Sequence, residues 1–267
     1  MGGIRPGWVI VLSVATALSG CGDDSSSDSG ADTTAAASSP STSDTPALSY
    51  VAFGDSWPEG AHCDGCTPFP QLWAEDLLTQ TGVAIGFEDF TGEKEESSGD
   101  DKATATMLES LRNSDATRTA VQNADIILIA TGPNEIGAAI EPLLAGTCGG
   151  PDQLDCVRAL GQEWHTNFEA ILTEIEALRD GQPTAIRLVN AAEPTAADLG
   201  EPADEFLEMG LPHIFEQLTV AMCDAAAVHS AVCIDVRPLF TGAEENAPES
   251  MRAVTDALVE TGLAELD

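Results

Sequence analysis

The chain has 267 residues, enough for one mid-sized domain with appendages, and 43% of them are hydrophobic, so most of it is expected to fold around a core. Its 10 Lys and Arg residues face 45 Asp and Glu residues, and the formal net charge of −35 excludes nucleic acids and anionic lipid headgroups as partners. One Tyr and four Trp supply too few aromatic side chains for a lectin-like sugar groove.

An apolar run near the N-terminus predicts an export signal. Residues 8–18 are too few to span a bilayer and stand where the hydrophobic core of a signal peptide belongs. The sequence Leu-Ser-Gly-Cys21 follows, and it resembles the lipobox of bacterial lipoproteins, in which the Cys is lipidated. The resemblance implies that residues 1–21 are a lipoprotein signal peptide and that the exported protein is lipid-anchored to the cell membrane, facing the extracytoplasmic side. An ordinary signal peptide with an incidental Cys21 is the alternative.

Residues 22–46 consist almost entirely of Asp, Ser, Thr, Ala, Gly and Pro without periodicity. Such a segment cannot bury a core and is predicted to be a disordered acidic linker. The folded domain is therefore expected to span residues 47–267, held away from the membrane by this tether.

Within that domain, short apolar runs alternate with longer segments of helical periodicity. Strands are predicted at 50–53, 83–87, 126–130, 185–189 and 232–236. Helices are predicted at 70–80, 104–123, 157–179, 204–228 and 248–266. Apolar strands separated by helices indicate a parallel sheet covered on both faces. The predicted fold class is α/β, a three-layer α/β/α sandwich with a five-stranded parallel sheet of flavodoxin-like type.

Apart from Cys21, the chain contains six Cys residues that form three close pairs in the sequence. In an exported chain, local disulfides are the simplest interpretation, although proximity does not prove the pairing. The predicted bridges are Cys63–Cys66, Cys148–Cys156 and Cys223–Cys233. A zinc site or thioredoxin-like element at Cys63-Asp-Gly-Cys66 is the weaker alternative, because no second ligand pair stands nearby.

Three short motifs follow the first three predicted strands, at the sheet edge where ligands bind in such folds. They are Gly54-Asp55-Ser56, Thr91-Gly92 and Gly132-Pro133-Asn134-Glu135. Their order and placement resemble the sequence blocks of the SGNH (GDSL-type) hydrolases. The resemblance implies that Ser56 is a nucleophile and that the N–H groups of Ser56 and Gly92, with the Asn134 side chain, form an oxyanion hole. Gly99, in the same acidic loop as Gly92, is an alternative oxyanion donor.

The chain departs from the family where an Asp-x-x-His block is expected, because residues 237–251 contain no His. The candidate general bases are therefore His62, His165, His213 and His229. His165 falls in a predicted helix and His229 at the far end of another, so both are expected away from Ser56, whereas His213 follows the fourth strand and is expected in a loop at the active edge. His62 is favoured, because a Cys63–Cys66 bridge would hold it near Ser56, and the alternative is that no His serves.

The predicted function is an envelope-anchored serine ester hydrolase that acts through a Ser56 acyl-enzyme. A non-catalytic binding lipoprotein on a degenerate SGNH fold and an SGNH-type acyltransferase are the alternatives. The substrate would be a small-molecule, lipid or glycan ester, the membrane would be contacted through the N-terminal lipid only, and the chain is expected to be a monomer. No motif implies a cofactor or a metal, although the acidic loop 88–101 could bind a cation weakly.

Overall fold

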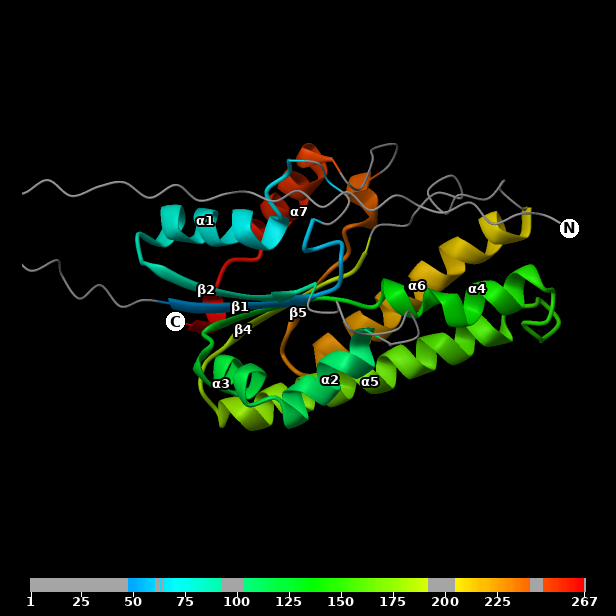
Figure 1. Cartoon of the computed structure of the whole chain (residues 1–267), viewed down its shortest axis with the longest axis horizontal. Coiled ribbons are helices and arrows are strands. Elements are labelled where there is room, and N and C mark those ends of the chain that lie inside the picture. Colours follow the sequence, from blue (N-terminus) through cyan, green and yellow to red (C-terminus); the bar gives the residue numbers. More distant parts are fainter. Residues whose placement is uncertain are drawn as a thin grey trace, which may run out of the picture. The chain divides into compact units, whose positions relative to one another are not determined.

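The structure, a computed structural model, describes residues 48–60, 63, 65–92, 103–191, 205–240 and 247–266 (Figure 1). Several predictions fall outside these residues: the signal peptide with Cys21, the linker 22–46, His62, Gly99 and most of the acidic loop. Part of the segment that lacks the family's His block, residues 241–246, also lies outside them.

A five-stranded parallel sheet forms the centre of the fold, in the order β2-β1-β3-β4-β5. The strands are β1 (Leu48–Gly54), β2 (Ile85–Thr91), β3 (Ile126–Ala130), β4 (Ala185–Val189) and β5 (Val232–Ile234). Every residue of β3 and β4 is buried, as expected for strands covered by helices on both faces. The strand order is the flavodoxin-like one, which confirms the predicted fold class.

The edge strand β2 runs from 85 to 91, whereas the sequence predicted a strand at 83–87. It pairs with β1 over its whole length, from Leu48↔Ile85 to Gly54↔Thr91. Phe87 stacks on Tyr50 and Phe90 stacks on Phe53, with ring centroids 4.8 and 5.3 Å apart. An edge strand can alternate apolar and polar residues, so the two acidic residues between these rings do not end it.

Helices cover both faces of the sheet (Figure 1). On one face α1 (Phe69–Thr81) packs against α7 (Pro248–Glu260). On the other face α2 (Ala103–Asn113), α3 (Asp115–Asn123) and α6 (Glu205–Val228) all contact α5 (Asp155–Arg179). A short helix, α4 (Gly137–Leu144), follows β3 and was not predicted from the sequence.

Two of the predicted helices are shorter than expected. The segment 104–123 divides into α2 and α3, because the Ser114 side chain accepts a hydrogen bond from the Thr117 N–H (3.3 Å) and starts a new helix. The last predicted helix, 248–266, ends at Glu260, and Gly262 then adopts a φ of 63°. Left-handed backbone of this kind is typical of helix ends.

Helices α5 and α6 extend well past the sheet. Their 25 and 24 residues correspond to about 36 Å each, about twice the length of a five-residue strand. Figure 1 shows their projecting parts beside α4, and α4 contacts both. Two glycines allow this packing, since an added Cβ would lie 2.7 Å from the Gln217 side chain at Gly161 and 2.9 Å from Leu143 at Gly210.

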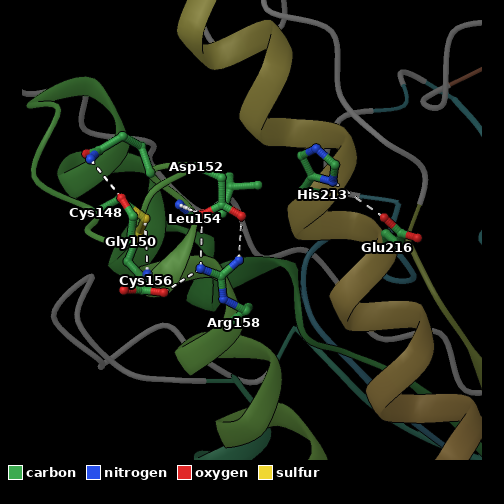
Figure 2. Close-up of polar contacts among 10 residues, drawn as sticks. Cys148, Gly150, Asp152, Leu154, Cys156, Arg158, His213 and Glu216 are labelled. Carbon is green, nitrogen blue, oxygen red and sulfur yellow. Dashed lines mark hydrogen bonds and ion pairs between the residues drawn. A yellow bond between two sulfur atoms is a disulfide. The ribbon is translucent and has the colours of Figure 1, made fainter.

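All three predicted disulfides are present, with Cα atoms 5.4 Å apart at Cys63–Cys66, 4.9 Å at Cys148–Cys156 and 5.1 Å at Cys223–Cys233. The second closes the loop between α4 and α5, where Arg158 also binds Asp152 and Asp155 (Figure 2). The third ties α6 to β5. Among the described residues, no helix is both long and apolar enough to cross a membrane.

Buried cations join the elements near the amino ends of the strands. Arg187 of β4 is fully buried and binds both carboxylate oxygens of Glu265 at 2.9 Å, which fixes the C-terminal segment. Arg179, at the end of α5, donates to the Gln122 carbonyl at the end of α3 (2.5 Å). Carbonyls at a helix C-terminus lack intrahelical partners and attract a positive charge.

His229, just after α6, is held between two carboxylates of α5. Its Nε2 lies 3.2 Å from Glu169 and its Nδ1 lies 3.1 Å from Glu176, while the side chain is only 9% exposed. Both ring nitrogens can donate only when the imidazole is protonated. Burial, the largest single effect, lowers the pKa of His229, but the hydrogen bonds and charges of the two glutamates together outweigh it and raise the pKa above 6.5.

The raised pKa makes the stability of this contact depend on pH. The stabilisation is fully present below the unfolded-state pKa of about 6.5 and is lost as the pH rises through the higher folded-state pKa. We expect His229→Gln to lower the melting temperature most at pH 5.5 and least at pH 9.

Thermal unfolding of the wild type and the variant across this range measures the effect. His213→Gln is the matched control, because His213 has one carboxylate neighbour, Glu216, and a side chain that is 51% exposed. A His229→Gln penalty that does not change with pH would contradict the prediction.

Candidate active site

The candidate active site lies where the strand order reverses, between β1 and β3. In an open parallel sheet the crevice beyond the carboxyl ends of such a strand pair is the usual ligand site. Ser56 follows β1 in a turn over residues 56–60, and Asn134 follows β3. The sheet thus brings together two predicted site residues that are 78 positions apart in the chain.

The turn that carries Ser56 is fixed by the buried Asp55. The Asp55 N–H donates to the Ala130 carbonyl of β3 (3.3 Å), and its carboxylate accepts from the Trp57 N–H (3.1 Å). Such an Asx turn holds the residue between its two partners, here Ser56, in a defined position. The Ser56 side chain is half-buried and makes no hydrogen bond to any residue in the described part of the chain.

Gly54, the last residue of β1, is required by a close approach of the backbone. A Cβ at this position would lie 2.7 Å from the Ala130 carbonyl oxygen and would also collide with the Pro58 ring. A larger residue would therefore push β1 away from β3 exactly where the candidate site begins.

Gly92 follows β2 with a φ of 68°, so a glycine is favoured there. Its N–H donates to the Gly54 carbonyl (3.1 Å), and a Cβ on it would collide with the Glu59 carboxylate. The N–H group that the family resemblance assigns to the oxyanion is thus engaged in this conformation. A substrate oxygen could use this donor only by sharing or replacing the bond to Gly54.

Asn134 lies in a short 3-10 turn, η1 (Pro133–Ile136). The turn starts at Gly132, whose φ of 132° favours glycine and whose Cα approaches Leu218 of α6. The Asn134 side chain is exposed and makes no hydrogen bond within the described residues. The Asn134 side chain therefore does not bond its own backbone, and its amide is available to a ligand.

The three described histidines have contacts away from Ser56. His165 Nδ1 lies 3.4 Å from the Ala221 carbonyl, and His229 is held by the two glutamates described above. His213 lies within α6 and pairs with Glu216, 3.5 Å away (Figure 2). The expectation that His213 lies in a loop is wrong, because α6 continues through Pro212. His62 lies outside the described residues.

The sequence analysis missed a polar network at the ends of β4 and β5. Asn190 is fully buried, donates to Thr219 Oγ1 and Asp235 Oδ1 (both 2.7 Å), and accepts from the Val236 N–H (2.8 Å). Arg237 binds both Asp235 oxygens, and its hydrogen bond is the largest cause of the lowered pKa of Asp235. The signal in the sequence was the position of Asn190 directly after the apolar run 185–189 and of Asp235 near the end of the strand predicted at 232–236, which in the structure ends at Ile234.

No metal site is apparent: within the described ranges, no three His, Cys, Asp or Glu side chains are grouped to hold an ion. A cavity of about 400 Å³ lies at the opposite edge of the sheet, lined by Arg179, Gln182, His229, Ser230 and Glu265 among others. Arg179, His229 and Glu265 in its lining make the contacts described above, and the cavity lies away from the segments that follow β1 and β3.

No protein-family model and no curated protein matches the chain. Among solved structures, it is similar to the lipase Lip_vut3 from a goat rumen metagenome, with a TM-score of 0.62, 17% identity, and coverage of 82% of this chain and 100% of that one. An extracellular lipase from Streptomyces rimosus gives a TM-score of 0.53 at 18% identity, covering 80% of this chain and 100% of that one. A protein described as a GDSL-like lipase from Parabacteroides merdae gives a TM-score of 0.51 at 14% identity, covering 80% and 94%. The chain therefore has the fold of the GDSL/SGNH lipases and esterases.

Proposed function

We propose that the protein is a serine ester hydrolase with Ser56 as its nucleophile. The observation that carries the proposal is the placement of Ser56 and Asn134 just after the neighbouring strands β1 and β3, at the switch point of the sheet, each with a polar side chain not engaged by the described residues. The fold, shared with proteins described as lipases, supports ester substrates. The substrate class remains a small-molecule, lipid or glycan ester.

In the proposed reaction, Ser56 Oγ attacks the acyl carbonyl carbon while a base removes its proton. The tetrahedral intermediate expels the alcohol, which receives that proton, and leaves an acyl group on Ser56. A water molecule then attacks this ester, releases the carboxylic acid and restores the serine. The negative oxygen of each tetrahedral intermediate would be bound by the Asn134 amide and by backbone N–H groups, of which Ser56 and either Gly92 or Gly99 are the candidates.

The proposed general base is His62. It stands one position before the Cys63–Cys66 bridge and only six positions after Ser56 in the sequence, which favours it over histidines that are distant in the chain. The other three histidines have the contacts described above, which leaves His62 as the favoured imidazole. A protein with no base would instead be the binding lipoprotein of the second hypothesis.

Two substitutions test the nucleophile and the oxyanion donor. Ser56→Ala is expected to abolish hydrolysis of p-nitrophenyl esters, and Asn134→Ala to lower kcat by roughly 100- to 1,000-fold, because one oxyanion donor is lost. Asn123→Ala is the matched control, since Asn123 is an exposed amide on α3. Full activity of Ser56→Ala would reject the proposal, and a wild type inert towards every ester would favour a binding protein. Products formed with an added sugar acceptor would reveal an acyltransferase.

A second prediction concerns the base. His62→Ala is expected to abolish activity, and the wild-type rate is expected to fall as the pH drops through an imidazole pKa of about 6.5, because the protonated ring accepts no proton. The pH–rate profile of kcat/KM measures this. Activity that survives His62→Ala but is lost in His213→Ala would transfer the role to His213.

The third prediction concerns the membrane anchor. If Cys21 is lipidated, the exported wild type should sediment with membranes and Cys21→Ala should appear in the soluble extracytoplasmic fraction. Fractionation followed by mass spectrometry of the mature N-terminus checks both points. Equal membrane association of the two proteins would refute the lipid anchor.

A further inference from the structure

The residue next to the proposed oxyanion donor is a buried carboxylate. Glu135 is 3% exposed, whereas the adjacent Asn134 is exposed, so the two side chains of the η1 turn point in different directions. A buried carboxylate is costly unless it is hydrogen-bonded. One of its oxygens, Oε1, accepts from the Thr104 N–H (2.8 Å) and also from the Thr104 hydroxyl by a short hydrogen bond.

Thr104 is fully buried and lies in the first turn of α2. The N–H groups of a first turn have no partner within the helix, and the positive end of the helix dipole favours a carboxylate there. The Thr104 hydroxyl, which donates to Glu135, also accepts from Asn167 Nδ2 of α5 (2.9 Å). A continuous chain of hydrogen bonds therefore runs from α5 through α2 to the η1 turn.

The η1 turn contains only four residues and starts at a glycine with a φ of 132°. A turn this short has few hydrogen bonds of its own, so contacts to other elements help to fix its position. The bond from the Glu135 N–H to the Gly132 carbonyl (3.2 Å) closes the turn on itself but does not attach it to the helices. The Glu135 carboxylate supplies an attachment about 30 positions away in sequence, at Thr104.

We propose that Glu135 is a positioning residue, which holds the Asn134 amide where it can bind the oxyanion. The inference rests on the proposed function of Asn134. Displacement of a catalytic group by about 1 Å can cost up to about 100-fold in rate, so a tie of this kind acts on kcat and hardly on substrate affinity. Glu135 itself does not contact the substrate.

Two variants weaken the tie with little change in shape: Glu135→Gln removes the charge, and Thr104→Val removes the hydroxyl but keeps the bond from the backbone N–H. Each is expected to lower kcat for a p-nitrophenyl ester by about 10- to 100-fold with KM nearly unchanged. Thr255→Val is the matched control, because Thr255 is an equally buried threonine on α7 whose hydroxyl, among the described residues, donates to the Met251 carbonyl alone. It is expected to alter the melting temperature without altering kcat.

Combination with Asn134→Ala separates positioning from general stability. If Glu135 acts through Asn134, adding Glu135→Gln to Asn134→Ala should lower kcat by less than about twofold, since coupled residues are not additive. Hydrogen exchange of residues 131–136 should also become faster in Thr104→Val than in the wild type.

The outcomes distinguish the two proposals. An active wild type in which Glu135→Gln keeps full kcat, or loses as much in the Asn134→Ala background as alone, overturns the positioning role and leaves the proposed function intact. A wild type inert towards every ester overturns the proposed function and the positioning role with it.

Discussion

The parallel pairing of β1 with β3 is the constraint on which the candidate site depends. These strands are distant in sequence, and their pairing from Tyr50↔Ile126 to Gly54↔Ala130 places the ends of both at one point. The Asp55 N–H extends the pairing by one more bond to Ala130. The chain leaves the two strands toward opposite faces of the sheet, and in open parallel sheets ligands commonly bind at such a point. The segments that carry Ser56 and Asn134 are therefore brought to the same end of the sheet by this pairing.

Polar residues near the amino ends of the strands are hydrogen-bonded or ion-paired, whereas two polar side chains just after the carboxyl ends of β1 and β3 are not. Near the amino ends, Arg187 and Arg179 are buried cations whose partners are carboxylates or helix-end carbonyls, and the His229 ring lies between two glutamates. In a chain with only 10 Lys and Arg residues, these contacts join elements that carry much negative charge. At the carboxyl edge, Ser56 and Asn134 keep side chains without such partners in the described residues. Side chains such as these can form hydrogen bonds to a ligand without first breaking bonds to the protein.

Support for the site extends beyond the residues that would touch a substrate. Glu135 and Asp55 are buried acids beside the two proposed functional residues, and each bonds backbone N–H groups of its neighbourhood. Their placement explains how two short segments outside the strands and α-helices can hold a defined geometry. Asp55, just before Ser56, and Glu135, just after Asn134, thus each anchor the segment in which they lie through hydrogen bonds to backbone N–H groups.

The sequence by itself determined the alternation of buried strands and helices, the three local disulfides and the positions of Ser56 and Asn134 at strand ends, because each depends on residues close together in the chain. It misplaced β2 and merged α2 with α3, because an edge strand tolerates acidic residues and a single Ser114 cap ended a periodic pattern. Only the tertiary structure decided that Glu135 is buried against Thr104, that Asn190 binds Asp235, and that His229 lies between two glutamates. Those contacts join residues 31 to 60 positions apart, and polar pairing at such separations leaves no periodicity in the sequence.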